Sequence, residues 1–137
     1  MLINFSIQNY KSIYKRLDLS FTAEPIKQHE ENNLIETDYQ VNLLKSLAIY
    51  GANASGKSNL IKALTFMRDF VLTSASRTES EQKINIDPFK LLIKSQNEPT
   101  LFEVDMIVNE KRYKYGFELF RLRVEKEYLV AFLKTTE

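Results

Sequence analysis

The chain has 137 residues and a mass of 16.1 kDa, and 44% of its residues are hydrophobic, which is enough for about one domain with a hydrophobic core. Its 19 Lys and Arg residues nearly balance its 18 Asp and Glu residues, so the net charge of +1 provides no overall attraction to nucleic acid or to a membrane. The absence of cysteine excludes a disulfide scaffold, a thiolate metal site and a cysteine nucleophile. The N-terminus lacks the pattern of a signal peptide and no apolar run has membrane-spanning length, which predicts a soluble, cytoplasmic protein.

Residues 1–46 predict two strands followed by a long loop. Apolar residues alternate with polar ones over residues 2–7 and again over residues 17–22, which is the period of a half-buried strand and indicates an antiparallel hairpin. Residues 24–42 are polar and predict a loop. The only histidine, His29, lies in this loop without neighbours at metal-ligand or catalytic spacing, so we expect it to be solvated rather than catalytic.

Residues 47–73 have the pattern of a strand, a glycine-containing loop and a helix. A third strand is predicted over residues 44–50, and the next residues, GANASGKS, fit G-x-x-x-x-G-K-[ST], the phosphate-binding loop. Apolar residues then recur at spacings of three and four, as on one face of a helix. These residues are Leu60, Ile61, Ala63, Leu64, Met67, Phe70 and Val71.

Each residue type in this loop suits a phosphate group. Gly51 and Gly56 can adopt backbone angles closed to other residues and allow the main chain to approach a phosphate closely. The backbone N–H groups from Ala52 to Ser58 can point into one concavity at the positive end of the helix. Lys57 can contact the β- and γ-phosphates and the Ser58 hydroxyl can ligate Mg²⁺, so the pattern predicts a nucleotide site.

Residues 74–137 predict a loop followed by an antiparallel β-meander. Pro88 interrupts any regular element over residues 84–93, whereas residues 102–108, 113–119 and about 122–133 have strand patterns. In the stretch RYKYGFELF, basic and aromatic residues alternate, as in some nucleic-acid-binding surfaces. We favour a half-buried strand, which would place Tyr113, Tyr115 and Phe117 in the core and leave Arg112 and Lys114 facing water.

Four stretches give the chain a resemblance to a known group of proteins: FSIQNYKSI (residues 5–13), GANASGKSNL (51–60), Pro88-Phe89 and YKYGF (113–117). In these the chain resembles the ABC-type ATPase heads of the SMC, RecF and OLD-like group. It is most similar to bacterial AAA-annotated ATP-binding proteins of that group, many of which occur in phage-defence and abortive-infection systems. The resemblance implies a mixed α/β P-loop NTPase fold, with residues 1–137 as the first lobe of a head: an antiparallel β-subdomain and one main helix after the phosphate loop.

The same resemblance implies ATP and Mg²⁺ as cofactors and a head-to-head homodimer that forms when ATP is bound. It further implies a nuclease or toxin effector as a partner and allows nucleic acid as a ligand, with no membrane association. Asn53 would lie near the γ-phosphate, and Lys11 and Ser12 beside the nucleotide or DNA. The expected nucleotide-binding residues are Gly51, Ala52, Asn53, Ala54, Ser55, Gly56, Lys57, Ser58 and Asn59, with Ser58 as the metal ligand.

Several motifs of such an ATPase are missing from the sequence. There is no apolar strand ending in Asp-Glu (Walker B), no Gly-Gly of the signature motif and no histidine after the phosphate loop, and only Gln82 and Gln96 are available as a Q-loop residue. We therefore assign no catalytic residue and interpret the chain as the N-terminal portion of a longer ATPase that acts as an ATP-dependent switch in defence or DNA metabolism. One alternative is a complete small phosphotransferase with Asp87 or Asp105 as its carboxylate. The other is a non-hydrolysing nucleotide-binding interaction module.

Overall fold

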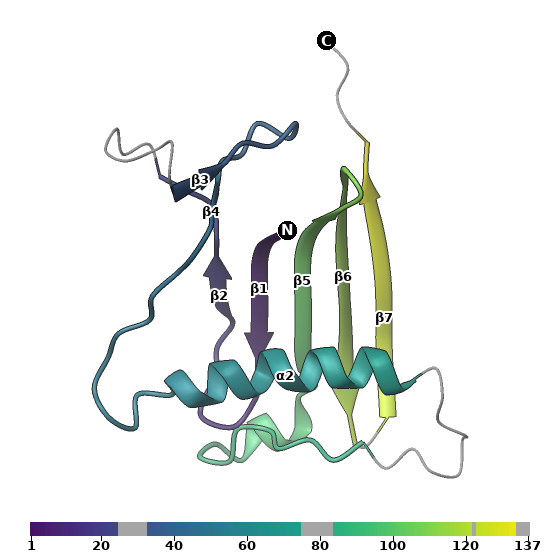
Figure 1. The fold of residues 1–137 in the computed structure, drawn as a ribbon. Coiled ribbons are helices and arrows are strands. Elements are labelled where there is room, and N and C mark those ends of the chain that lie inside the picture. Colours follow the sequence, from purple (N-terminus) through teal and green to yellow (C-terminus); the bar gives the residue numbers. More distant parts are fainter. Residues whose placement is uncertain (25–32, 75–83, 122, 134–137) are drawn as a thin grey trace.

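The computed structural model describes residues 1–24, 33–74, 84–121 and 123–133. Its main feature is a five-stranded, fully antiparallel sheet with the strand order β2-β1-β5-β6-β7 (Figure 1). The strands are β1 (Leu2–Gln8), β2 (Leu17–Ser20), β5 (Thr100–Val108), β6 (Lys111–Phe120) and β7 (Arg123–Phe132). The predicted N-terminal hairpin and C-terminal meander are both confirmed.

A second, two-stranded ladder lies beside the end of β2 and corrects the prediction for residues 44–50. It consists of β3 (Leu34–Ile35), within the predicted loop, and β4 (Leu43–Leu44). The predicted third strand is wrong, because β4 ends at Leu44 and residues 46–50 lie in no strand. A strand requires a neighbour that accepts and donates its ladder hydrogen bonds, and no strand of the described residues pairs with this segment. Its side chains are consequently exposed, with Tyr50 at 90%.

One long helix, α2 (Lys57–Ser74), crosses one face of the sheet (Figure 1). Leu60, Ala63 and Met67 are buried at the expected spacing, which confirms the core-facing stripe. The stripe is narrower than predicted, however, since Ile61 is 55% and Val71 is 42% exposed. Helix α2 buries one side against the sheet, and these two apolar residues lie outside that contact.

Aromatic rings fix α2 against the sheet. Phe102 of β5 and Phe117 of β6 are fully buried neighbours with ring centroids 5.3 Å apart. From the helix, Phe66 stacks on Phe102 at 5.0 Å and Phe70 lies 4.5 Å from Phe117. Offset aromatic contacts of this kind add to the free energy of burial and restrict the relative position of the rings. The core therefore determines where the N-terminal end of α2, and the loop before it, lies relative to the sheet.

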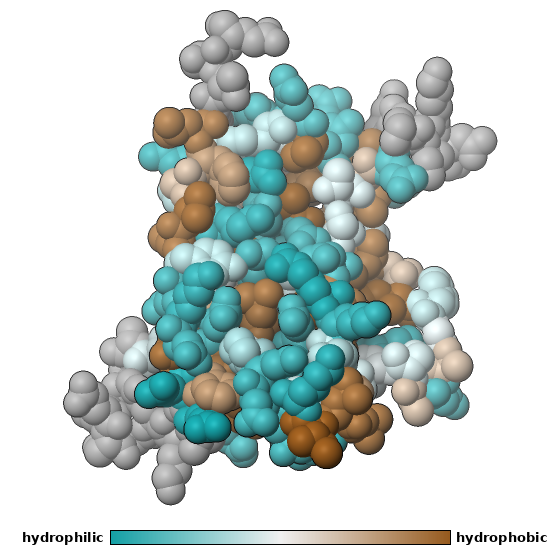
Figure 2. Space-filling view, turned by 180° about the vertical axis from the view of Figure 1, so that it is seen from behind, coloured by the Kyte–Doolittle hydropathy of each residue, from teal (hydrophilic) through white to brown (hydrophobic). Residues whose placement is uncertain are grey.

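The opposite face of the sheet is largely hydrophilic, with separate hydrophobic areas (Figure 2). On this face Arg112 donates to Asp105 at 2.7 Å, and the Lys114 ammonium lies 4.0 Å from Glu103. Phe117 is buried as predicted, whereas the tyrosines at 113 and 115 are only partly buried. Since both basic residues of the RYKYGFELF stretch have carboxylate partners, this face is charge-paired rather than basic, and the half-buried strand is the better interpretation.

The remaining sequence predictions fall on irregular segments. As Pro88 predicts, residues 84–93 form neither helix nor strand, and a short 3₁₀ helix, η2 (Lys94–Asn97), follows them. Gln96 is exposed in η2, whereas His29 and Gln82 lie outside the described residues. Within the described ranges, no helix combines the length and the apolar character that crossing a bilayer requires.

Candidate phosphate-binding loop

Residues 51–56 form a tight, exposed turn that leads directly into α2. The Ser55 N–H donates to the Ala52 carbonyl at 3.3 Å, and a side chain at Gly51 would bring its Cβ within 2.9 Å of Ser55 Oγ. Gly56 has φ +96°, a conformation that other residues rarely adopt, and Ala54 also has a positive φ of 63°. The observed backbone thus requires glycine at position 56 because of its dihedral angle, whereas a Cβ at position 51 would displace only the Ser55 hydroxyl.

The loop ends at the N-terminus of α2, which carries positive partial charge. Helical hydrogen bonds begin at Gly56, whose carbonyl accepts from the N–H groups of Asn59 at 2.9 Å and Leu60 at 3.1 Å. The first turn contains no acidic residue that would neutralise the helix dipole. The first N–H groups of a helix have no partner within it, so the start of α2 offers donors and positive potential to an anion.

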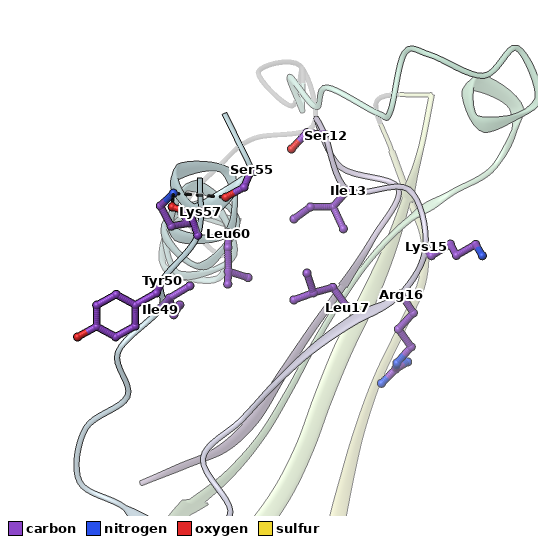
Figure 3. Close-up of a pocket in the computed structure, with 12 residues that line it drawn as sticks. Ser12, Ile13, Lys15, Arg16, Leu17, Ile49, Tyr50, Ser55, Lys57 and Leu60 are labelled. Carbon is purple, nitrogen blue, oxygen red and sulfur yellow. Dashed lines mark hydrogen bonds between the residues drawn. The ribbon is translucent and has the colours of Figure 1, made fainter. Parts of the chain in front are cut away.

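The Lys57 ammonium lies across the loop. It donates to the carbonyls of Gly51 at 2.7 Å and Ala52 at 2.6 Å, with a longer bond of 3.3 Å to Ser55 Oγ (Figure 3). These acceptors are neutral, and a phosphate oxygen would accept a shorter and stronger charge-assisted bond from the same ammonium. The donors of the loop, one cation together with backbone N–H groups, therefore fit a phosphate chain.

Ser58 is exposed in the first turn of α2, where the motif predicts a Mg²⁺ ligand. No cluster of three or more His, Cys, Asp or Glu side chains suited to a metal ion occurs among the described residues. Mg²⁺ is commonly held by one or two protein oxygens together with phosphate oxygens and water. The Ser58 hydroxyl fits that kind of site, in which the nucleotide supplies much of the coordination.

A cavity of about 550 Å³ lies between this loop and the β1–β2 connection. The side chains of Ile13, Leu17 and Leu60 point into it, whereas those of Lys15 and Arg16 point away (Figure 3). The cavity thus joins a polar, cationic loop to an apolar wall, a combination suited to a ligand with both a charged and a ring portion. Its lining residues are Ser12, Ile13, Lys15, Arg16, Leu17, Ile49, Tyr50, Gly51, Ser55, Gly56, Lys57 and Leu60.

The turn after β1 connects the loop to a distant segment of the chain. Lys11 donates to Asp87 twice, from its backbone N–H to the carbonyl at 2.8 Å and from Nζ to Oδ2 at 2.9 Å. The next residue, Ser12, accepts a hydrogen bond of 2.8 Å from Nδ2 of Asn59. Asn59, predicted as a nucleotide-binding residue, therefore directs its amide to this turn. No sequence pattern indicates the contact, because its partners are 47 positions apart.

The ion pair at Asp87 predicts a specific response to acid. Hydrogen bonds from Lys11 and then Lys90 hold the pKa of Asp87 below its usual value. The pair is therefore present above the unfolded-state pKa of about 3.9 and its stabilising contribution is lost as the pH falls through the lower folded-state value. We expect Asp87→Asn to lower the melting temperature slightly at pH 7 and not at pH 2, as followed by circular dichroism. An equal effect at both values would contradict a role for the charge.

Neither carboxylate proposed for a phosphotransferase lies at this cavity. Asp87 is paired with two lysines, and Asp105 accepts both hydrogen bonds of the Arg112 guanidinium on the hydrophilic face of the sheet. No Asp or Glu is among the residues that line the cavity. A phosphotransferase requires a carboxylate that accepts the proton of the acceptor hydroxyl, so the described residues do not favour that alternative.

Residues 46–137 match one protein-family model, described as "AAA domain, putative AbiEii toxin, Type IV TA system". The match begins just before the loop and extends through the meander, covering well over half of the chain. This match indicates the class, an AAA domain. The chain belongs to this AAA-domain family and carries an ATPase-like, ATP-binding portion. No curated protein and no solved structure matches the chain.

Proposed function

We propose that residues 51–59 bind the phosphate chain of ATP together with Mg²⁺. The observation that carries this proposal is the position of the Lys57 ammonium. Lys57 is the first residue of α2, and its ammonium spans the loop and donates to the carbonyls of Gly51 and Ala52 at 2.7 and 2.6 Å. Residues 51–58 would surround the phosphates with backbone N–H groups, and Ser58 would supply the protein ligand to Mg²⁺. When bound, the metal ion would neutralise phosphate charge; the contribution of the chain itself is to hold the phosphates in a fixed place.

The apolar wall of the cavity is suited to the nucleoside. Ile13 and Leu17 face the loop across the cavity and offer contact area to a base. Side chains of this kind provide burial but no hydrogen bonds that read the edge of the base. The affinity of the site would therefore come mainly from the phosphates, with the base adding hydrophobic contact.

We propose further that the chain is the first lobe of an ABC-type head related to the SMC, RecF and OLD-like ATPases, within a longer protein. Support comes from apolar groups that the described residues leave uncovered: Ile61 and Val71 on α2, and the unpaired segment 46–50. A helix that is apolar on more than one side is usually covered on more than one side. A further layer of the same protein would cover α2 and pair with residues 46–50.

In the longer protein, ATP would hold two heads together and hydrolysis would release them, which makes the protein an ATP-dependent switch. The switch would act in bacterial defence or DNA metabolism with a toxin or nuclease as the effector, and the family description, which names a putative toxin of a type IV TA system, supports the toxin link. No carboxylate lines the cavity, so the chain by itself would bind nucleotide and hydrolyse it poorly. That observation also favours the second candidate function, a nucleotide-binding interaction module that does not hydrolyse ATP.

Calorimetric titration with ATP, ADP, AMP and adenosine, each with and without Mg²⁺, tests the proposal. We expect ATP and ADP to bind more tightly than AMP, and Mg²⁺ to strengthen ATP binding, because the loop recognises phosphates beyond the first. Adenosine should show little binding. Equal affinity for AMP and ATP would contradict the proposal, as would the absence of any nucleotide binding at millimolar concentration.

A further inference from the structure

We infer that Ser12 and Asn59 act together as positioning residues that hold the phosphate loop against the β-sheet. The inference rests on the proposed nucleotide site and concerns how that site is kept in shape. Neither residue needs to touch the nucleotide in this role. They act through the backbone at Gly56, which is the point where the loop becomes the helix.

The first contact joins side chains from distant parts of the sequence. Nδ2 of Asn59 donates to Oγ of Ser12 at 2.8 Å, which connects the first turn of α2 to the turn after β1. Asn59 is held in turn by its own backbone N–H, which donates to the Gly56 carbonyl at 2.9 Å. Because the backbone of Asn59 is held in the helix, its side-chain amide restricts the position of the Ser12 hydroxyl.

The second observation is that Ser12 lies close to Gly56. A Cβ added at Gly56 would lie 3.1 Å from Ser12 Oγ, and no other atom would come as close to it. The Ser12 hydroxyl therefore lies beside the Cα of Gly56, where the backbone has a φ of +96°. Removing the hydroxyl would leave space into which the loop could relax.

The turn that carries Ser12 is itself firmly anchored, which a positioning element requires. Tyr10 and Ile13 form a β-bridge across the turn, and Lys11 is bound to Asp87 through both its backbone and its side chain. Asn9 is fully buried, and its amide donates to the carbonyls of Ser95 at 2.7 Å and Glu98 at 2.8 Å. Ser12 is thus fixed to the sheet, so its contact with Asn59 fixes the loop to the sheet as well.

The test is a double-mutant cycle in nucleotide binding. Ser12→Ala and Asn59→Ala should each weaken Mg²⁺–ATP binding about fivefold, the effect of losing one hydrogen bond of ordinary strength. Because both substitutions remove the same contact, the double variant should bind no more weakly than either single variant. Ser12→Thr keeps the hydroxyl and should restore wild-type affinity.

Melting temperature without nucleotide distinguishes positioning from a general loss of stability. The hydrogen bond between Ser12 and Asn59 is exposed to solvent. The melting temperatures of the single variants should therefore stay close to that of the wild type. Thr65→Ala is the matched control, since this exposed hydroxyl of α2 donates only to the Ile61 carbonyl within the same helix. Its nucleotide affinity should be unchanged.

The possible outcomes separate this inference from the proposed function. If the wild type binds Mg²⁺–ATP and the Ser12 and Asn59 variants bind it equally well, the positioning role is wrong and the nucleotide site stands. Additive losses in the double variant would also overturn the inference, because they would show that the two residues act independently. If the wild type binds no nucleotide, the proposed function fails and the inference fails with it.

Discussion

Lys57→Ala is expected to reduce the affinity for Mg²⁺–ATP by at least about 100-fold, which amounts to loss of measurable binding where the wild-type affinity is modest. The substitution removes the one mobile cation of the loop, whose Nζ donates to the carbonyls of Gly51 and Ala52. Backbone N–H groups remain, but they carry only partial charge and do not replace a full positive charge beside a triphosphate. Calorimetric or fluorescence titration with ATP measures the change directly.

Two control variants show whether the effect belongs to the loop. Lys62→Ala removes an exposed lysine five positions further along the same helix and should leave ATP affinity unchanged. Lys57→Arg keeps the charge but has a different shape, and partial loss of affinity is expected because a planar guanidinium does not fit the place of a compact ammonium. Unchanged ATP binding by Lys57→Ala would remove the loop from its assigned role.

Most of the sheet could be predicted from the sequence, because its pattern is local. Strands β5 and β6 show the alternation of apolar and polar residues that follows from side chains pointing to opposite faces, and β1 and β2 show it in shorter form. The tight turn before α2 was predictable for a similar reason, because the glycines that indicate it lie within eight consecutive residues; its phosphate-binding role stays a prediction. Properties that depend on nearby positions can be read from one sequence.

Residues 46–50 show where that reasoning fails. Their apolar character is that of a buried strand, but a strand forms only where another strand supplies hydrogen bonds, and the sequence of the segment does not specify that neighbour. The same limit applies to Ile61 and Val71, whose spacing predicts a helix face without saying what covers it. These errors share one cause: whether such residues form a strand or become buried depends on a neighbouring segment, which local sequence does not identify.

The contact between Ser12 and Asn59 was unpredictable for the same reason. Both are ordinary polar residues, and only the antiparallel pairing of β1 with β5 and the packing of α2 on the sheet bring them together. The loop motif therefore predicts which residues meet a phosphate, whereas the fold determines which residues keep the loop in place. Long-range contacts of this kind require the three-dimensional structure.

The second large expected effect is on stability, and it concerns the hydrophobic core between α2 and the sheet. Phe102→Ala is expected to destabilise the protein by about 3–5 kcal/mol, the usual cost of truncating a buried phenylalanine. Phe102 is fully buried, with ring centroids of Tyr10, Phe66 and Phe117 at 5.5, 5.0 and 5.3 Å. The total stability of most domains is about 5–15 kcal/mol, so much of it would be lost.

Urea denaturation followed by circular dichroism measures this loss of stability. The control is Leu129→Ala, because the Leu129 side chain is 64% exposed. Its stability should change by no more than about 0.5 kcal/mol.

The same substitution should weaken nucleotide binding even in molecules that remain folded. Two of the rings that rest on Phe102 belong to the elements that Ser12 and Asn59 join: Tyr10 lies in the turn after β1 and Phe66 in α2. Loss of the ring between them would allow the turn and the helix to shift relative to each other, and with them the loop. We therefore expect Phe102→Ala to lower ATP affinity under conditions where circular dichroism shows a folded protein, whereas Leu129→Ala should not. Full ATP affinity in folded Phe102→Ala would show that the loop keeps its shape independently of the core.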